Sequence, residues 1–385
     1  MSTNNGYAPG LEGIVAAETE LSHVDGLKGE LIIAGFPLAR LATNATFEET
    51  VFLLWHGRLP NQQELAALKN ELAELRPLPP ATLTLLREAA NAHTTPMDAL
   101  RMASATLDLG SGPQDHLATA KMIVARLATI VASYHRLRQG QEPVAPNPAL
   151  GQAANFLYML TGEAPSDARV RGLETYLNTV VDHGLNASTF AARVIVATQS
   201  DLVSAITGAI GALKGPLHGG APGPALDTVF EIGTADRAEA VLQAKLEAGE
   251  RLMGFGHRVY KVRDPRAEVL GAAAEKMFQA DGDMALYELA KSVEETAVRL
   301  LAIHKPGRNL QTNVEFYTAL LLHGLGLETD IFTPTFAIGR TAGWLAHCFE
   351  QIKYGRLIRP QSRYTGVMKI GRAHVSSVPN PAIPA

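Results

Sequence analysis

Two histidines of this chain lie among glycines, at points where a helical pattern is interrupted. His218 stands in Gly215-Pro-Leu-His218-Gly-Gly220, and His257 stands in Gly254-Phe-Gly-His257. Glycine lets the backbone adopt turns that other residues avoid and lets it approach a ligand closely. A histidine held in such a segment is placed to face a substrate rather than to pack in a core. His218 and His257 are therefore the first candidates for catalytic residues.

Basic residues follow the second histidine and recur towards the C-terminus. They are Arg258, Lys261, Arg263 and Arg266, then Arg308, Arg340, Arg356 and Arg359. Guanidinium groups donate two parallel hydrogen bonds, which suits carboxylates and phosphates. We interpret Arg263 and Arg356 as part of a solvated face. Arg266 and Arg340 lie among apolar residues and glycine, and an unpaired buried charge is costly, so each is predicted to have an anionic partner.

Motifs for other kinds of site are missing from the sequence. It has no His-Glu-x-x-His and no cysteine pair, so we expect no metal. Gly254-x-Gly256 lacks the third glycine of a dinucleotide fingerprint, and there is no phosphate-binding loop, so we expect no bound cofactor. The net charge of −4 gives no sign of a nucleic-acid partner.

Helices must position these residues, because helical periodicity dominates the sequence. Phe47, Val51, Leu54 and Trp55 share one helical face. Thr46 and Glu49 have the spacing of a capping box, and Gly57 supplies a stop. Apolar stripes over 202–213 and 286–301 repeat the pattern, whereas Leu31-Ile-Ile33 is the best strand candidate. The fold is predicted to be all-α.

Length and composition indicate a two-domain protein of the cytoplasm. The chain has 385 residues, of which 46% are hydrophobic, more than a single core usually holds. Its one cysteine, Cys348, cannot form a disulfide within the chain, which is consistent with a reducing compartment, and we interpret it as a buried thiol. The start lacks a signal-peptide pattern, and no apolar run approaches the roughly 20 residues of a membrane span. Breaks between helical regions are expected at 138–150, 215–224, 304–312 and Thr333-Pro334. The tail from about 369 is interpreted as disordered or as added sequence.

Several longer sequence motifs, which follow one another in the same order, resemble those of citrate synthases of the compact bacterial and archaeal kind. The resemblance extends from about Gly10 to Gly366. The motifs are Gly10-Leu-Glu-Gly-Ile-Val-Ala-Ala-Glu-Thr, Leu54-Trp-His-Gly-Arg-Leu-Pro60, Pro96-Met-Asp-Ala-Leu-Arg101, Ala154-Asn-Phe-Leu-Tyr-Met-Leu-Thr-Gly162, Asp182-His183-x-x-Asn186-Ala-Ser-Thr189, Asn313-Val-Glu315 and Phe332-Thr-Pro-x-Phe-Ala-Ile-Gly-Arg-Thr-Ala-Gly-Trp-Leu-Ala346. The resemblance implies an all-α fold with two domains. It also implies condensation of an acyl-coenzyme A with oxaloacetate.

The resemblance implies a role for each matching residue. His218 would stabilise the enol of the acyl group, His257 would polarise the keto group of oxaloacetate, and Glu315 would remove the α-proton. The dicarboxylate would be held by His183, Arg266, Arg340 and, from a partner subunit, Arg359. Coenzyme A would be bound by Leu252, Gly254, Phe255, Gly256, Lys261 and Arg308. No metal and no further cofactor are implied.

One departure concerns the base, which is usually an aspartate in Asn-Val-Asp and here is Glu315. The extra methylene moves the carboxylate by roughly 1.5 Å, and a displacement of about 1 Å can cost roughly 10²-fold in rate. Gly184, where the family often has glutamate, and Pro222-Gly223 are smaller departures. Together they bear on substrate choice more than on reaction class.

The resemblance also implies boundaries and an oligomeric state. The large domain would comprise 1–217 and 331–385, and the small domain, 218–330, would carry His257 and Glu315. An active site completed by Arg359 of a second chain implies a homodimer.

The function expected first is citrate synthase, which converts acetyl-CoA and oxaloacetate into citrate and CoA. 2-Methylcitrate synthase, which uses propionyl-CoA, shares every motif, and one methylene is worth only about 1–3 kcal/mol of discrimination. A hypothesis of another class is a catalytically weak paralogue that binds citrate or coenzyme A. Glu315 is the feature that supports it.

Overall fold

The protein is described here from a computed structural model that covers residues 7–110, 115–219, 223–257 and 259–367. These residues form sixteen α-helices, three short 3-10 helices and one three-stranded sheet. The all-α prediction is therefore confirmed. The expected tail from residue 369 lies outside the described residues.

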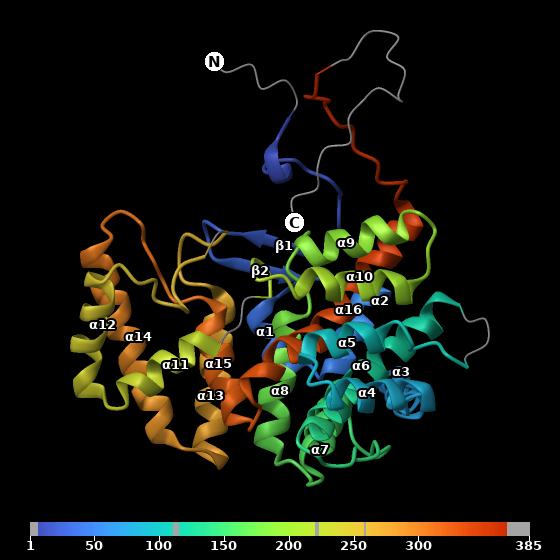
Figure 1. Ribbon diagram of the computed structural model, residues 1–385, viewed down its shortest axis with the longest axis horizontal. Coiled ribbons are helices and arrows are strands. Elements are labelled where there is room, and N and C mark those ends of the chain that lie inside the picture. The colour runs from blue at the N-terminus through green and yellow to red at the C-terminus, as the bar shows by residue number, and fades with distance from the viewer. Residues whose placement is uncertain (1–6, 111–114, 220–222, 258, 368–385) are drawn as a thin grey trace, which may run out of the picture.

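Eleven helices form the larger group, and the buried helix α6 is one of them (Figure 1). They are α1 (Leu38–Asn44), α2 (Phe47–His56), α3 (Gln62–Leu75), α4 (Pro80–Asn91), α5 (Pro96–Ser104), α6 (His116–Arg138), α7 (Gln152–Thr161), α8 (Asp167–Val180), α9 (Ala187–Val196), α10 (Leu202–Leu213) and α16 (Phe332–Tyr354). Helix α6 packs against α3, α4, α5, α7, α10 and α16, which makes it the centre of this group.

Five further helices lie together at one side of the molecule (Figure 1). They are α11 (Gly223–Ile232), α12 (Ala238–Glu247), α13 (Pro265–Asp281), α14 (Met284–His304) and α15 (Val314–Gly324). Helix α13 packs against α15 within this set and against α8 of the larger group. The 3-10 helices are Pro9–Leu11, Ala235–Arg237 and Thr329–Ile331. The domain limits 1–217, 218–330 and 331–385 stay a prediction.

Local signals in the sequence account for several helix ends. Thr46 and Glu49 form a reciprocal capping box at the start of α2, and Gly57 ends that helix in a left-handed conformation. Thr95 caps α5, with Pro96 in its first turn. The predicted stop at Gly215 also holds, because α10 ends at Leu213.

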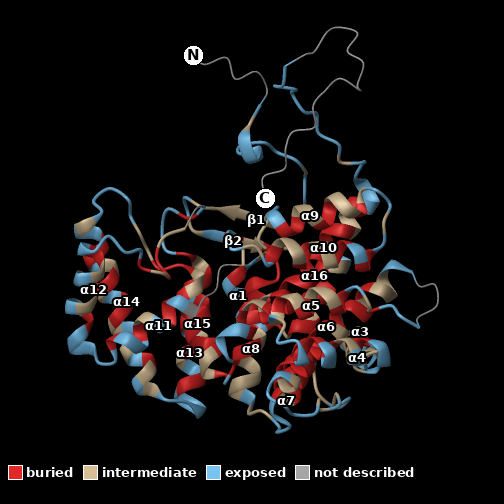
Figure 2. Ribbon diagram, viewed as in Figure 1, coloured by how far each residue is buried: buried red, intermediate tan, exposed pale blue. Residues whose placement is uncertain are grey.

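Buried side chains concentrate on α6, α10 and α16 (Figure 2). By length and composition alone α6 could cross a membrane, but 72% of its most apolar window is buried inside the protein. Burying a large apolar side chain contributes about 1.5–3 kcal/mol, so this helix anchors the core. Cys348 is buried there as predicted, and burial raises the pKa of its thiol to about 12.

Two details differ from the sequence-based expectation. Thr333-Pro334 is no break, because both residues lie in the first turn of α16, where a proline needs no intrahelical hydrogen-bond donor. The predicted strand at Leu31–Ile33 belongs to a small sheet. That sheet pairs β1 (Ser22–Asp25), β2 (Glu30–Ile33) and β3 (Phe36–Pro37) in antiparallel order.

Candidate active site

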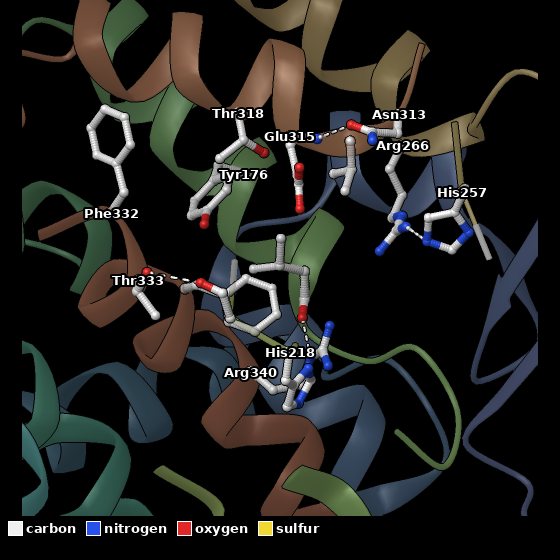
Figure 3. A pocket seen from close by; sticks show the side chains of 14 residues that line it. Tyr176, His218, His257, Arg266, Asn313, Glu315, Thr318, Phe332, Thr333 and Arg340 are labelled. Atoms are coloured by element: carbon white, nitrogen blue, oxygen red, sulfur yellow. Dashed lines mark hydrogen bonds between the residues drawn. The ribbon is translucent and has the colours of Figure 1, made fainter. Parts of the chain in front are cut away.

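A cavity of about 180 Å³ lies where α15 and α16 face the two histidine segments (Figure 3). Its walls include His218, His257 and Glu315, the three predicted catalytic residues, together with Arg266 and Arg340. Tyr176, Val180, Thr318, Phe332 and Phe336 add apolar surface. Polar groups therefore converge in a largely apolar pocket, which is typical of small-molecule sites.

Glu315 stands in the first turn of α15, and Asn313 fixes that turn. The Asn313 side-chain oxygen accepts the Glu315 backbone N–H at 2.9 Å, as a helix cap. The Asn313 side-chain nitrogen donates to the Gly256 carbonyl at 2.9 Å, which ties α15 to the His257 segment. Burial raises the pKa of Glu315, although Arg251 and Arg266 oppose that rise. A carboxylate with a raised pKa is a stronger base than an ordinary glutamate.

His218 is held by Ser188, at the start of α9. The Ser188 backbone N–H lies 3.3 Å from Nε2 of His218, and the Ser188 hydroxyl lies 2.7 Å from the same nitrogen. A backbone N–H can only donate, so Nε2 accepts and the proton of the neutral ring sits on Nδ1. Burial and then Arg340 lower the pKa of His218, which also favours the neutral ring.

His257 has the opposite tautomer. The backbone N–H groups of Val259 and Tyr260 each lie 3.1 Å from its Nδ1, so Nδ1 accepts and the neutral ring carries its proton on Nε2. Burial and then Arg266 lower the pKa of His257 to about 4. The Nη2 atom of Arg266 lies 3.2 Å from Nε2, and because arginine only donates, its proton and the Nε2 proton compete in this contact, so an acceptor oxygen placed beside the two would receive hydrogen bonds from both.

Arg266 is buried, and the anionic partner predicted for it is Asp264, two residues away. The Arg266 Nε and Nη2 atoms donate to the two oxygens of Asp264 at 3.0 and 2.7 Å. Burial opposes the charge of Arg266, but Asp264 outweighs that effect and the pKa of Arg266 is raised. One edge of the guanidinium is thereby fixed, and the rest faces the cavity.

Arg340 lies on α16 and is 2% exposed. Its Nε donates to the Val180 carbonyl at 2.5 Å, and its guanidinium stacks over the Phe336 ring at 4.7 Å. Burial lowers the pKa of Arg340 to about 10, and Asp182 opposes that fall. No ion pair of Arg340 is found among the described residues, so its predicted anionic partner is not a bonded side chain there.

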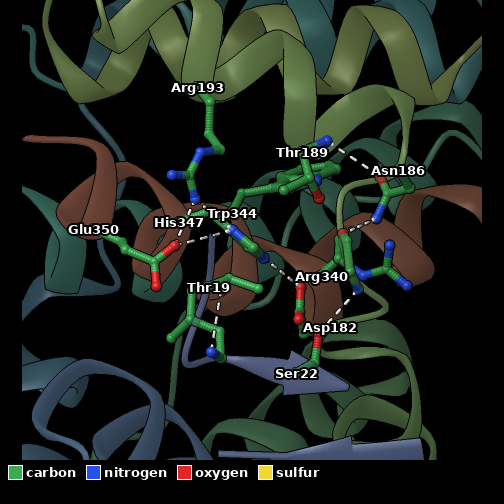
Figure 4. A network of polar contacts seen from close by, with 12 residues as sticks. Thr19, Ser22, Asp182, Asn186, Thr189, Arg193, Arg340, Trp344, His347 and Glu350 are labelled. Atoms are coloured by element: carbon green, nitrogen blue, oxygen red, sulfur yellow. Dashed lines mark hydrogen bonds and ion pairs between the residues drawn. The ribbon is translucent and has the colours of Figure 1, made fainter. Parts of the chain in front are cut away.

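A chain of buried polar contacts lies behind Arg340 (Figure 4). Arg193 donates to Nδ1 of His347 at 3.0 Å and pairs with Glu350 at 2.6 Å. Because arginine only donates, the proton of His347 sits on Nε2, which donates to Asp182 at 3.1 Å. Burial alone would raise the pKa of Asp182, but His347 and Arg340 outweigh it and hold that pKa below its usual range. An ionised Asp182 thus offsets part of the Arg340 charge.

His183 adjoins this region through Tyr260. Its Nε2 lies 3.1 Å from the Tyr260 hydroxyl, and its ring meets that of His257 edge-on at 6.0 Å between centroids. Burial, then Arg266 and Arg340, hold the pKa of His183 well below its ordinary value. His183 and His257 therefore lie side by side as neutral rings.

A second cavity, of about 740 Å³, opens beside the first and shares His257, Asn313 and Glu315 with it. Leu252, Phe255, Gly256 and Arg308, which were predicted to bind coenzyme A, are among its lining residues. Arg251 and Lys305 also line it, so three cationic side chains face this space. Glu250 lines it too, so cationic groups outnumber the carboxylates of Glu250 and Glu315 by three to two, and this excess beside a candidate base suits a long anionic acyl carrier.

The glycines of this segment are required by its backbone. Gly254 and Gly256 have φ of 88° and 83°, in the left-handed region that glycine adopts without strain. Gly256 donates to the Gln311 carbonyl at 2.7 Å, and Asn313 donates to the Gly254 carbonyl at 2.9 Å. The segment thus pairs with 311–313 and carries the second cavity to the edge of α15.

Four predicted site residues are not among the lining residues of either cavity, namely His183, Gly254, Lys261 and Arg359. Lys261 is exposed in the His257 segment and is not among the lining residues of the second cavity. Arg359 is exposed on the segment after α16, away from the cavity of its own chain. Their proposed contacts with coenzyme A and with a partner's dicarboxylate stay predictions.

Sequence reasoning missed the residues that orient the candidates. Ser188, Tyr260 and Asp264 each contact one of them, and Arg251 and Lys305 join the second cavity. Asp264 was detectable, because it stands two residues from Arg266. Within the described ranges, no three histidine, cysteine or carboxylate side chains are grouped so that they could hold a metal ion.

Comparison with known proteins gives one consistent result. The family model described as "Citrate synthase, C-terminal domain" matches residues 10–361. The citrate synthase of Haloferax volcanii is 43% identical over 368 residues, covering 93% of this chain and 95% of the relative. A 2-methylcitrate synthase of Mycobacterium tuberculosis is 39% identical over 365 residues, covering 93% and 90%.

A solved structure agrees with the sequence relatives. The citrate synthase of Thermoplasma acidophilum, in a ternary complex with carboxymethyl coenzyme A and oxaloacetate, is 29% identical, with a TM-score of 0.85 and coverage of 96% of this chain and 98% of that one. The family match spans most of the chain, and the similarity covers the segments that line both cavities. This chain belongs to the citrate synthase family.

Proposed function

We propose that the protein condenses acetyl-CoA with oxaloacetate and hydrolyses the citryl-CoA intermediate to citrate and CoA. The observation that carries this proposal is the meeting of Glu315, His218 and His257 at one cavity that also holds Arg266 and Arg340. A base, two neutral imidazole donors and two cations form the set that an enolisation followed by attack on a keto acid requires. The coenzyme A thioester is a substrate in this proposal, and no bound cofactor takes part.

In the first step, the Glu315 carboxylate takes a proton from the acetyl methyl group. The α-proton of a thioester is weakly acidic, so its removal requires stabilisation of the developing enolate oxygen. The Nδ1–H of His218 would donate to that oxygen. A donor that is already neutral and oriented by Ser188 needs no reorganisation when the charge develops.

In the second step, the enolate carbon attacks the keto carbon of oxaloacetate, and a carbon–carbon bond forms as the carbonyl π bond opens. The Nε2–H of His257 would polarise the keto oxygen and pass it a proton. Arg266, Arg340 and His183 would hold the two carboxylates, joined by Arg359 of a second copy. Water then cleaves the thioester, which releases CoA and the third carboxylate of citrate.

The second cavity supports a coenzyme A site, because Arg251, Lys305 and Arg308 would meet phosphates while Leu252 and Phe255 offer apolar surface. The ternary complex of the Thermoplasma enzyme supports the same two classes of ligand, an acyl-CoA and oxaloacetate. We also place Gly254 and Lys261 in this binding segment. We propose the cytoplasm as the compartment of the protein.

We further propose a homodimer. The terminal segments, 7–19 and 355–367, leave the body on the same side (Figure 1) and expose apolar side chains, among them Tyr7, Val15, Leu357 and Tyr364. Exposed apolar groups gathered in one region mark interaction sites. A second copy that covers these segments would bring Arg359 to its partner's cavity.

Thiol release tests the reaction and the acyl preference together. Oxaloacetate is mixed with acetyl-CoA or propionyl-CoA at matched concentrations, and the products are identified by NMR. We expect faster release with acetyl-CoA, and citrate as the product. The Mycobacterium relative favours 2-methylcitrate synthase as the second candidate, which preferential use of propionyl-CoA would support. Binding of both ligands with no thiol release would overturn the enzymatic proposal and leave the ligand-binding paralogue.

A further inference from the structure

A β-hairpin formed by β1 and β2 contacts two segments that carry candidate site residues, although none of its residues lines either cavity. Its strands pair from Ser22–Ile33 to Asp25–Glu30. The turn is rigid, because one oxygen of Asp25 accepts the backbone N–H groups of both Leu27 and Lys28 at 3.0 Å. The hairpin is therefore a stiff ribbon with two distinct ends.

The turn end of the hairpin contacts residues 259–261, which follow His257 and are called the His257 segment. The Lys261 backbone N–H donates to the Gly26 carbonyl at 2.8 Å. A Cβ atom at Gly26 would lie 2.3 Å from the carbonyl oxygen of Val259, closer than real Cβ atoms come. Gly26 is thus a place where two backbones touch. Val259 and Tyr260 are also the residues whose N–H groups orient His257.

The other end of the hairpin contacts the His183 segment. The Gly184 backbone N–H donates to the Ser22 hydroxyl at 3.0 Å. Ser22 and Gly26 are four residues apart, which in a strand spans about 13 Å. The same short ribbon therefore reaches the residue after His183 and the residues just after His257.

The two contacted segments also meet each other on the cavity side, through His183 and Tyr260. That contact is one hydrogen bond between side chains, whereas the hairpin meets residues 259–261 through backbone atoms at Gly26 and meets Gly184 through the Ser22 hydroxyl. Backbone contacts fix the position of a segment more firmly than a single side-chain bond, which each partner's rotation can break. The hairpin is thus fixed to residues 259–261 through backbone atoms and is joined to Gly184 by one further hydrogen bond, so it links the two segments independently of the contact between His183 and Tyr260.

We propose that this hairpin is a positioning element, with Gly26 as the positioning residue that lets it seat against the His257 segment. The inference rests on the proposed roles of His183 and His257 and deepens them. Seated, the hairpin holds both histidines in register for one dicarboxylate. Pushed away, it lets the His257 segment shift relative to His183.

Gly26→Ala tests the proposal, because Gly26 is not among the glycines with positive φ and the added methyl brings only the contact. To restore an ordinary contact of 3.4 Å from 2.3 Å, hairpin and segment must separate by roughly 1 Å. Gly211→Ala on α10 is the matched control, since its Cβ would meet only Arg101, at 3.9 Å.

Three measurements separate the outcomes. We expect Gly26→Ala to lower kcat about 10–100-fold, to speed amide exchange at Lys261, and to leave amide exchange in α6 unchanged, while Gly211→Ala behaves as the parent. Faster exchange at Lys261 with parental kcat would show that catalysis does not need the hairpin. Unchanged exchange at Lys261 would show that the hairpin does not seat there, and either result overturns the proposal.

The exchange measurement needs no activity, so it distinguishes failure of this inference from failure of the proposed reaction. Ser22→Ala serves as the second variant if Gly26→Ala does not fold. It removes the bond to Gly184, and we expect a higher KM for oxaloacetate with an unchanged KM for acetyl-CoA. Equal changes in both KM values would contradict a positioning role for the hairpin.

Discussion

The Tyr260 hydroxyl and Nε2 of His183 lie 3.1 Å apart and join two segments that are 77 residues apart in the sequence. Tyr260 also packs against the ring of His257, at 5.0 Å between centroids. One phenol therefore touches both histidines that face the proposed dicarboxylate. Burial raises the pKa of Tyr260 to about 12, so it stays protonated at neutral pH and keeps a donor beside His183.

Tyr260→Phe should weaken oxaloacetate binding while preserving the ring contacts. A single hydrogen bond contributes about 0.5–1.5 kcal/mol, so the Kd should rise by up to about tenfold. Isothermal titration with oxaloacetate measures this change directly. Tyr158→Phe on α7, at a half-buried tyrosine outside both cavities, is the control. An unchanged Kd for Tyr260→Phe would show that His183 does not depend on the phenol.

Ser188→Ala should impair catalysis through His218. The variant removes the hydroxyl 2.7 Å from Nε2 and leaves the Trp344 N–H, which donates to that hydroxyl at 3.0 Å, without its partner. We expect kcat to fall about tenfold, and stability to fall by about 1–2 kcal/mol. Oxaloacetate affinity should not change. Trp344→Phe removes the indole donor and part of a buried ring but keeps the Ser188 hydroxyl, so a similar loss of kcat in that variant would assign the effect to packing instead.

Glu315→Gln should abolish enolisation and retain oxaloacetate binding. The amide keeps the shape of the side chain but cannot accept the proton, and general-base contributions are typically about 10²–10⁴-fold. Exchange of the acetyl methyl protons, followed by NMR with a non-reacting oxaloacetate analogue, isolates the step. Glu315→Asp restores the residue usual in the family and is the control. Exchange by Glu315→Gln at the parental rate would remove Glu315 from the role of base.

The same carboxylate predicts a pH dependence. The base works only when it is deprotonated, and burial raises the pKa of Glu315. Activity is therefore lost, as pH falls, at a higher pH than the value of about 4.3 for an ordinary glutamate would give. The acid limb of kcat/KM reports this pKa in the free enzyme. An acid limb at or below the ordinary value would contradict burial of the base.

Glu174, on α8, predicts a pH dependence of stability that is separate from the site. Burial raises its pKa to about 7, although Arg171 lies 3.0 Å away. A carboxyl with a raised folded-state pKa contributes stability that is full below its unfolded pKa and is lost as pH rises through about 7. Glu174→Gln should thus gain stability relative to the parent between pH 5 and pH 8, by on the order of 1–3 kcal/mol.

Thermal unfolding at the two pH values measures that gain, with Glu163→Gln at an exposed position as the control. The expected difference appears at pH 8 and fades at pH 5. A constant offset between parent and Glu174→Gln at both pH values would show that Glu174 does not titrate in this range.

Much of the fold was predictable because its signals are local. The capping box of Thr46 and Glu49, the Thr95 cap and the stop before Gly215 all act within a few residues. The prediction of a break at Thr333-Pro334 was wrong because proline is compatible both with a break and with a first helical turn. The pattern around Leu31 predicted one strand, but its partners depend on pairing across a turn.

The candidate site was also predictable only as far as its signals are local. The glycine-flanked histidines and Glu315 were visible as residue types, and the cavity brings them together. Their orientation was not visible, because Ser188 reaches His218 across 30 residues and Trp344 reaches Ser188 across 156. Such contacts depend on how α9 and α16 pack, and no local pattern encodes that packing.

The exposed position of Arg359 has a consequence for mixtures of defective chains. If Arg359 acts in a partner's cavity, His257→Ala and Arg359→Ala chains, each inactive alone, complement one another after mixing and reassembly. Random pairing makes half of the dimers hybrid, and each hybrid has one site with both residues intact, so about a quarter of the sites recover. Mixtures that stay inactive, although subunits exchange, would place Arg359 in the cavity of its own chain or outside the reaction.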